Sequence, residues 1–191
     1  MDCERLRPAI FLDRDGTINR EVNHLSSPEE LELLPGVKEA LLRLEAHFPL
    51  VVVTNQAAIA RGKLSKPTLE VIHERLVDLL DPVGLTGIYF CPHHPTAGEE
   101  PYRRVCPCRK PAPGMLLQAS SDLAVDLERS VIIGDKLSDL EAGRSVGCRT
   151  ILVLTGYGLE ESSKLVANPW RPDFVADDLG AAADWIIKEM L

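Results

Sequence analysis

Residues 9–17 read Ala-Ile-Phe-Leu-Asp-Arg-Asp-Gly-Thr, a short apolar run that ends in two closely spaced aspartates. An apolar run without polar interruption is typical of a central parallel strand that is covered on both faces. Two further runs share this pattern, namely Leu-Val-Val-Val-Thr at 50–54 and Val-Ile-Ile-Gly-Asp at 131–135. The three runs predict buried strands of one sheet.

Helical patterns alternate with these strands. Apolar residues at helical spacing predict helices at about 35–47, 66–80, 113–121, 138–146 and 179–190, and further apolar runs predict strands at 87–90, 150–154 and 174–176. Strand and helix alternation of this kind is typical of an open sheet with helices on both faces. We therefore expect an α/β, Rossmann-like fold with a mostly parallel sheet, formed by residues 1–191 as a single domain.

Composition excludes several classes of partner. The chain carries 21 Lys and Arg against 29 Asp and Glu, a net charge of −8, which disfavours binding to the phosphate backbone of a nucleic acid. No apolar run approaches the ~20 residues of a membrane span, and residues 1–5 do not resemble a signal peptide. Five cysteines, an odd number, indicate a reducing compartment. We expect a cytoplasmic monomer without nucleic-acid or membrane partners.

Polar residues follow three of the predicted strands. Asp13 and Asp15 follow the first strand, Thr54, Asn55 and Gln56 the second, and Asp135 and Asp139 the fourth. Because ligands of open α/β sheets bind beyond the carboxyl ends of the strands, these side chains are expected to meet there. Carboxylate oxygens suit Mg²⁺ together with a substrate phosphate. The alternative is that each aspartate only caps a turn or a helix.

Four motifs in this order resemble the haloacid dehalogenase superfamily of phosphatases: Asp13 to Thr17, Thr54-Asn55, Lys110-Pro111, and Gly134-Asp135 with Asp139. The resemblance implies that Asp13 is a nucleophile that forms an aspartyl-phosphate. It implies that Asp15 is first the general acid and then the general base.

The same resemblance assigns the remaining motif residues. Thr54 and Lys110 would hold the phosphoryl oxygens. Asp13, the backbone carbonyl of Asp15, and Asp135 would bind a catalytic Mg²⁺. Asp139 would orient either Lys110 or the groups around the metal.

A second cluster has the spacing of a structural zinc site. Cys91 and His93 are followed by Cys106 and Cys108, which supplies three thiolates and one imidazole. We prefer His93 to its neighbour His94, because its spacing from Cys91 matches that between Cys106 and Cys108. The alternative is a set of reduced cysteines without metal. A zinc ion would fix the loop at about 91–110, which ends in Arg109 and Lys110.

The cysteine loop resembles the heptose bisphosphate 7-phosphatase branch of the superfamily and the related histidinol-phosphate phosphatases, which have no large cap domain. The resemblance implies Mg²⁺-dependent hydrolysis of the 7-phosphate of D-glycero-D-manno-heptose 1,7-bisphosphate. The product would be heptose 1-phosphate for nucleotide-activated heptose, as in lipopolysaccharide or surface glycan biosynthesis. The alternatives are histidinol phosphate, another small sugar phosphate, or a catalytically silent phosphosugar-binding protein.

Substrate contacts are expected by resemblance from residues of four segments: Glu21, Val22, Asn23, His24, Thr54, Asn55, Gln56, Ala57, Arg109, Lys110 and Lys136. Two segments depart from the family. Ala57-Ala58 stands where relatives commonly have Ser-Gly, and residues 21–27 lack a Gly-Tyr-Val, which leaves the anomer preference open. Arg103 and Arg104 are either substrate contacts or a solvated loop face.

Other conspicuous residues are expected to be structural. We predict Cys148 to be a core thiol, Cys3 to lie in the amino terminus, Trp170 and Trp185 to pack, and His47 and His73 to lie on the surface.

Overall fold

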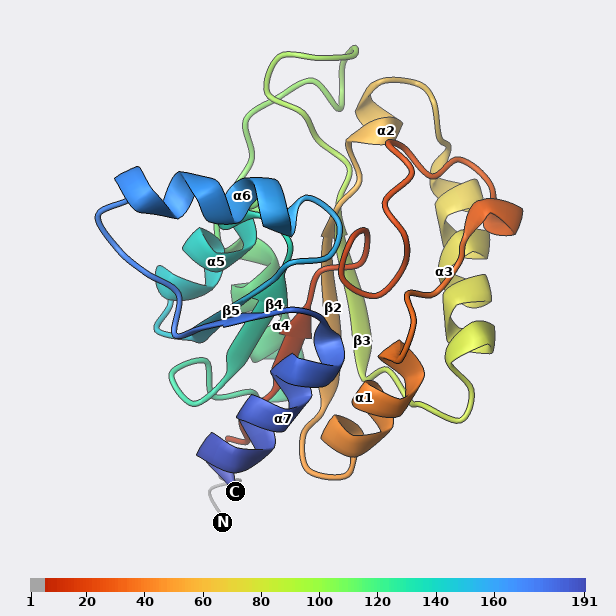
Figure 1. Cartoon of the computed structure of the whole chain (residues 1–191). Coiled ribbons are helices and arrows are strands. Elements are labelled where there is room, and N and C mark those ends of the chain that lie inside the picture. Colours follow the sequence, from red (N-terminus) through yellow and green to blue (C-terminus); the bar gives the residue numbers. More distant parts are fainter. Residues whose placement is uncertain (1–5) are drawn as a thin grey trace, which may run out of the picture.

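The computed structural model describes residues 6–191 and contains one six-stranded sheet in the order β3-β2-β1-β4-β5-β6 (Figure 1). Every neighbouring pair of strands is parallel. The strands are β1 (Ile10–Leu12), β2 (Leu50–Asn55), β3 (Gly87–Cys91), β4 (Val131–Gly134), β5 (Arg149–Val153) and β6 (Phe174–Ala176). The predicted α/β fold with an open, Rossmann-like sheet is confirmed.

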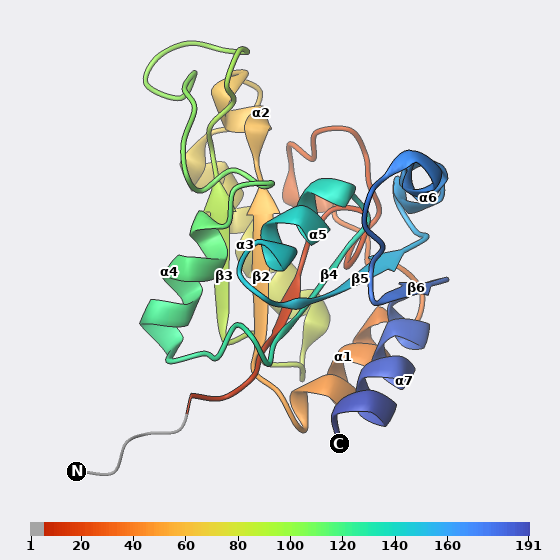
Figure 2. The ribbon, with the colours of Figure 1, turned by 90° about the vertical axis from the view of Figure 1, so that its left-hand side faces the viewer.

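Helices cover both faces of the sheet (Figure 2). Three helices pack on one face, α1 (Val37–Glu45), α3 (Lys66–Leu80) and α7 (Leu179–Met190). The other face is covered by α4 (Gly114–Leu123) and α5 (Leu137–Arg144). The remaining helical elements are short: α2 (Ala57–Ala60), α6 (Gly158–Lys164) and the 3-10 turns η1 (Pro28–Glu30) and η2 (Leu165–Ala167).

Two cores follow from the pleat of the central strands. Successive side chains of a strand point to opposite faces of its sheet. Accordingly, Ile10 and Leu12 pack with α1, α3 and α7, whereas Phe11 packs with α4 and α5. Because both faces are buried, β1 and β4 contain only apolar residues and glycine, which is the feature that made them recognisable.

All predicted strands and helices are present, with ends displaced by at most two residues. Two short helices escaped prediction, α2 and α6, of four and seven residues. An amphipathic pattern needs several turns to become recognisable, and neither helix is long enough.

The order of the strands reverses at β1, since the chain moves from β1 to β2 and β3 on one side and to β4, β5 and β6 on the other. In parallel sheets this reversal opens a crevice beyond the carboxyl ends of the strands. The segments after β1, β2 and β3 gather at this end, at the top of Figure 1. Within residues 6–191 these segments contain loops and short helical turns, and no further domain covers the crevice.

No helix of the described residues has both the length and the apolar character that crossing a lipid bilayer requires. Cys148 is buried, Trp185 stacks on Phe174 with ring centroids 5.5 Å apart, and Trp170 packs against a cluster that contains Leu140. These predictions are confirmed, as is that of an exposed His47. Cys3 lies outside the described residues.

The prediction of a surface position for His73 is wrong. Its side chain is 9% exposed and its ring lies 5.8 Å from that of Phe90. The physical reason is its place on α3: His73 lies four residues after Leu69 and three before Leu76, which are both buried. It therefore belongs to the core-facing stripe of the helix.

Burial lowers the pKa of His73 to about 4, and the nearby charge of Arg14 acts in the same direction. The ordinary pKa of histidine is 6.5, and His73 of the unfolded chain binds a proton as the pH falls through that value. The folded protein keeps His73 neutral at this pH. The contribution of neutral His73 to the unfolding free energy is therefore fully present above pH 6.5 and is lost as the pH falls towards 4. We predict that His73→Phe reduces the acid-side loss of unfolding free energy by up to ~3 kcal/mol, measured by urea denaturation at several pH values.

The matched control is His47→Phe, which makes the same change at an exposed position. It should leave the pH dependence of the wild-type protein unchanged. If the curves of His73→Phe and wild type run parallel between pH 4 and 6.5, His73 does not titrate as its burial requires.

Candidate active site

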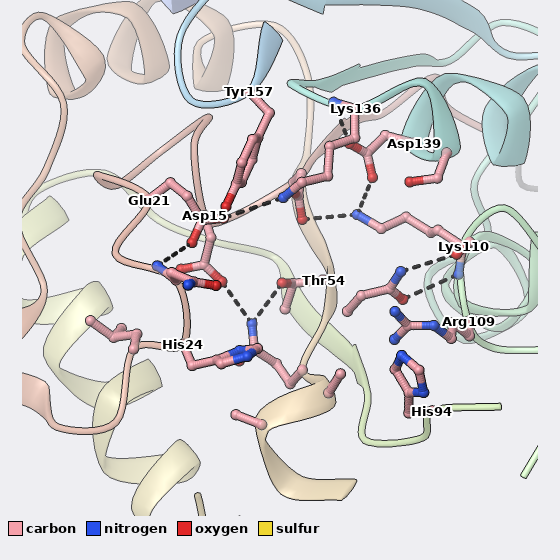
Figure 3. A pocket seen from close by; sticks show the side chains of 18 of the residues that line it. Asp15, Glu21, His24, Thr54, His94, Arg109, Lys110, Lys136, Asp139 and Tyr157 are labelled. Atoms are coloured by element: carbon pink, nitrogen blue, oxygen red, sulfur yellow. Dashed lines mark hydrogen bonds and ion pairs between the residues drawn. The ribbon is translucent and has the colours of Figure 1, made fainter. Parts of the chain in front are cut away.

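A cavity of about 500 Å³ opens at the carboxyl end of the sheet (Figure 3). It collects most of the residues that the sequence analysis singled out from segments far apart in the chain. Those that line it are Asp13, Asp15, Glu21, Asn23, His24, Thr54, Asn55, Gln56, Ala57, Arg109, Lys110, Lys136 and Asp139. Asp135 is fully buried beside Lys136 and Asp13.

Lys110 lies at the centre of this group. Its Nζ is 2.8 Å from Asp13 Oδ1 and 2.7 Å from Asp139 Oδ1, and it donates to the carbonyl oxygen of Val53 at 2.6 Å. The side chain is 2% exposed. Burial alone would lower the pKa of Lys110, but the charges of Asp13 and Asp139 raise it above its ordinary value. A charged ammonium is therefore fixed against Asp13.

The backbone of Lys110 is fixed as firmly as its side chain. Asn55, the last residue of β2, accepts a hydrogen bond from Lys110 N at 3.1 Å and donates one to Lys110 O at 3.1 Å. An amide side chain satisfies both backbone groups at once because it carries a donor and an acceptor. Asn55 thus positions Lys110 relative to the sheet.

Asp15 is held by three neighbouring side chains. Arg14 donates to both carboxylate oxygens, at 2.9 and 2.8 Å, while Asn19 and Gln56 each donate one hydrogen bond, at 3.0 and 2.9 Å. Burial would raise the pKa of Asp15, but the charge of Arg14 and these hydrogen bonds lower it. Asp15 is thus an ordered, ionised carboxylate. Thr54 joins the network by accepting from Gln56 at 2.9 Å.

Asp135 has an unusual environment. Its Oδ2 accepts from Tyr157 N at 2.9 Å, but its buried Oδ1 has no hydrogen-bond partner among the described residues. Burial, with Asp13 close by, raises the pKa of Asp135 to about 8. Gly16 passes so close, at φ +87°, that a Cβ there would stand 2.2 Å from Asp135 Oδ2. The space around this carboxylate is therefore kept free of side chains.

These acidic groups fit a hard cation. Oxygens of Asp13, Asp135 and Asp139 lie within 4.8 Å of one another. Asp135 Oδ1 receives no hydrogen bond from the described residues and has Lys136 Nζ only at 3.8 Å, and burial together with Asp13 raises the pKa of this carboxyl. A cation at this place would stabilise its charged form. Asp139 is already engaged by Lys110 and by the backbone N–H of Lys136 at 3.1 Å. Of the two roles expected for Asp139, the geometry favours orientation of Lys110.

The second donor cluster brings together Cys91, His93, Cys106 and Cys108. The three sulfurs lie 3.2–3.5 Å apart, and His93 Nδ1 lies 3.7 Å from Cys91 Sγ and 3.4 Å from Cys108 Sγ. These separations approach the ~3.8 Å edge of a tetrahedron with metal–sulfur bonds of ~2.3 Å. The cluster thus has the donors and the shape of a closed metal site, and it uses His93 rather than His94.

The cysteine cluster is connected to the cavity. Arg109 donates to the carbonyl oxygen of His93 at 3.0 Å, and Lys110 follows two residues after Cys108. In the sheet, Cys91 lies opposite Asn55, the residue that holds Lys110. The loop after β3 and the centre of the cavity are therefore one connected unit.

Lys136 forms a separate basic group. Its Nζ lies 3.2 Å from Glu21 Oε2, 3.8 Å from Asp135 Oδ1 and 4.4 Å from the centre of the Tyr157 ring. Burial opposes the charge, but Asp135 and other carboxylates raise the pKa of Lys136 above its ordinary value. Figure 3 shows Tyr157 and Glu21 beside this ammonium.

Three residues that were considered as substrate contacts do not line the cavity: Val22, which is 39% exposed, and the exposed Arg103 and Arg104. The arginine pair is thus a solvated loop face. Conversely, Arg61, His94, Ser138 and Tyr157 line the cavity without having been predicted to bind substrate. Tyr157 could have been found from the sequence, since it lies four residues after the end of β5, at the same edge of the sheet.

Comparison with known proteins identifies similar sequences. A family model described as HAD-hydrolase-like matches residues 107–182. The chain is 44% identical over 174 residues to D-glycero-beta-D-manno-heptose-1,7-bisphosphate 7-phosphatase of Escherichia coli K12, with 89% of this chain and 91% of the relative covered. It is 40% identical over 191 residues to D-glycero-D-manno-heptose-1,7-bisphosphate 7-phosphatase of Thermosynechococcus vestitus, with 96% and 97% covered.

Solved structures give the same result. The crystal structure of D,D-heptose 1,7-bisphosphate phosphatase from B. bronchiseptica, complexed with magnesium and phosphate, matches with a TM-score of 0.83 and 35% identity over 95% of this chain and 99% of the other. The corresponding enzyme from Burkholderia thailandensis matches with a TM-score of 0.69 and 31% identity over 96% and 100%.

The role of Asn55 in holding Lys110 generates a prediction. Asn55→Asp keeps the shape and the acceptor but places a carboxylate oxygen against Lys110 O, where a donor stood. We expect the unfolding free energy to fall by about 1–3 kcal/mol, measured by urea denaturation. The control is Asn23→Asp, the same change on an exposed residue, which should shift stability by less than about 0.5 kcal/mol. Equal losses in both variants would contradict the role of Asn55.

Proposed function

This chain belongs to the haloacid dehalogenase-like hydrolases, in the group of the heptose bisphosphate phosphatases, and we propose that it hydrolyses the 7-phosphate of D-glycero-D-manno-heptose 1,7-bisphosphate. The products are heptose 1-phosphate, a precursor of nucleotide-activated heptose, and inorganic phosphate. One observation carries the proposal: a buried ammonium, Lys110, is fixed on Asp13 at the floor of a cavity of about 500 Å³. Such a cavity is of the size that small-molecule sites have.

Asp13 is the proposed nucleophile. Its carboxylate oxygen attacks phosphorus, the bond between phosphorus and the C7 oxygen breaks, and an aspartyl-phosphate forms on Asp13. A carboxylate and a phosphate dianion repel each other, so the reaction needs positive charge at the contact. Lys110 Nζ supplies it, at 2.8 Å from Asp13 Oδ1.

Asp15 is the proposed proton carrier. The substrate-free protein keeps it ionised, and the negative charge of an arriving phosphoryl group raises the proton affinity of a nearby carboxylate. Asp15 then takes up a proton from solvent and gives it to the leaving C7 oxygen, and it later takes a proton from the water that hydrolyses the aspartyl-phosphate. Arg14, Asn19 and Gln56 keep its carboxylate in one orientation through both steps.

Mg²⁺ fits the acidic cluster, with Asp13, the backbone carbonyl of Asp15 and Asp135 as its proposed ligands. When bound, the ion neutralises phosphate charge and orients the phosphoryl group. Zn²⁺ fits the four donors Cys91, His93, Cys106 and Cys108, with no position left open for chemistry. Thr54 and Lys110 are the proposed partners of the phosphoryl oxygens, and Arg109 and Lys136 those of the rest of the substrate.

The proposal is tested by phosphate release in Mg²⁺. Wild-type protein should act on heptose 1,7-bisphosphate, and assays of both anomers and of histidinol phosphate establish its preference; the E. coli relative is named for the β anomer. Asp13→Asn should lower kcat by about 1,000-fold or more, because an amide cannot form the intermediate. Asp78→Asn, an exposed change on α3, is the control and should retain activity.

Faster turnover of histidinol phosphate than of either heptose anomer would overturn the proposed substrate. Activity of Asp13→Asn near that of the wild type would overturn the assignment of the nucleophile while leaving the substrate in place.

The zinc site gives a separate prediction. Elemental analysis of the purified protein should find about one zinc per chain, and a strong chelator should lower Tm, because coordination stabilises an otherwise irregular loop. Cys106→Ser should lose the metal, whereas Cys148→Ala, which removes a buried thiol outside the cluster, should keep it. A metal-free wild-type protein with unchanged Tm in chelator would refute the site.

A further inference from the structure

Two hydrogen-bonding side chains of the cavity, Arg61 and His94, lie next to each other. Arg61, from the loop after α2, places Nη2 3.4 Å from Nε2 of His94, which lies in the cysteine loop. Both residues line the cavity, and Figure 3 shows the His94 ring beside Arg109 at its edge. A guanidinium can only donate, so the nature of this contact depends on which nitrogen of His94 carries a proton.

The proton of His94 is located by its other ring nitrogen. Nδ1 accepts hydrogen bonds from the backbone N–H groups of Thr96, at 3.2 Å, and Ala97, at 2.8 Å. Backbone N–H groups only donate, so Nδ1 is unprotonated and the neutral ring carries its proton on Nε2. Rotating the ring by 180° would leave both N–H groups facing a carbon.

It follows that Nε2–H of His94 and the guanidinium of Arg61 are two donors whose nitrogens lie 3.4 Å apart, close enough for one acceptor to receive a hydrogen bond from both. Within residues 6–191, neither Arg61 nor Arg109 forms an ion pair. Lys136, by contrast, already has Glu21 and Asp135 as partners. The uncompensated positive charge of the cavity therefore lies at Arg61 and Arg109.

The donor pair is held in place by the packing of two segments. The backbone N–H of His94 donates to Tyr102 O at 3.1 Å. Gly98, at φ +85°, lets the cysteine loop lie directly on α2, since a Cβ there would stand 1.7 Å from the carbonyl oxygen of Ala60. Ala60 immediately precedes Arg61. The two backbone segments that carry Arg61 and His94 are therefore held together before a ligand arrives, which lowers the entropic cost of binding.

We propose that Arg61 and His94 together bind the phosphate of the substrate that is not hydrolysed, and that this pair selects sugar bisphosphates over monophosphates. One phosphate oxygen accepts from both donors, Arg61 contributes its charge, and His94 contributes a neutral N–H of fixed direction. The inference rests on the proposed function, because it takes the phosphate at Asp13 to be the one that reacts.

The test compares heptose 1,7-bisphosphate with heptose 7-phosphate, which lacks the second phosphate. Arg61→Gln and His94→Phe should each raise KM for the bisphosphate about 10- to 100-fold while kcat changes little. Both variants should leave KM for the monophosphate nearly unchanged. Arg61→Lys, which keeps the charge, should restore part of the loss. Lys63→Gln removes an equal charge from an exposed side chain that does not line the cavity, and should leave both KM values unchanged.

A readout without turnover separates this inference from the proposed function. Calorimetry on Asp13→Asn protein should show tighter binding of the bisphosphate than of the monophosphate, and adding Arg61→Gln should remove the difference. If the wild type does not hydrolyse heptose bisphosphate but this binding difference is found, the proposed function fails and the donor pair stands. If Arg61→Gln weakens both ligands equally, or if Asp13→Asn protein shows no preference for the bisphosphate, the pair is overturned. If His94→Phe does not fold, the variants of the exposed Arg61 still test the proposal.

Discussion

The site depends on one buried ion pair network, the ammonium of Lys110 between Asp13 and Asp139. Three separate parts of the chain supply these residues: the end of β1, the loop after β3 and the first turn of α5. Removing an ammonium from water costs several kcal/mol, and only close carboxylates offset that cost. Lys110 can therefore be buried only where both carboxylates are in place. The site forms only when the folded sheet brings Asp13 and Asp139 together around Lys110.

Lys110 belongs to a loop without regular structure, which explains why several contacts hold this loop in place. A lysine in such a loop would sample many positions, and the cost of ordering it must be offset by other contacts. Asn55 ties its backbone to β2, and the cluster of Cys91, His93, Cys106 and Cys108 closes the loop on itself. The cysteine cluster thus contributes to the chemistry by fixing the position of Lys110. A metal held by its four donors has no open coordination position.

The sequence predicted those features that depend on local pattern, and failed where side chains meet across the fold. Apolar runs located every strand, and the aspartates after β1 and β4 marked the acidic cluster. The failures have physical causes. The burial of His73 depends on its place in the helical stripe of α3, which residue type alone does not indicate. The choice between the two roles of Asp139, which the sequence left open, depends on a distance, 2.7 Å to Lys110 Nζ. The contact between Arg61 and His94 exists only because two loops pack together.

The charges of the cavity explain how a chain of net charge −8 can attract phosphate groups. Lys110 and Lys136 each lie against carboxylates, so the positive charge that they bring to a bound phosphate group is already balanced in part. Two imbalances remain: an excess of negative charge at Asp135, whose pKa is raised to about 8, and uncompensated positive charge at Arg61 and Arg109. A bound cation balances the negative charge at Asp135, and the phosphate that is not hydrolysed balances the positive charge of Arg61 and Arg109. Because salt screens charges beyond ~10 Å, these local imbalances decide what binds, and the net charge of the whole chain does not.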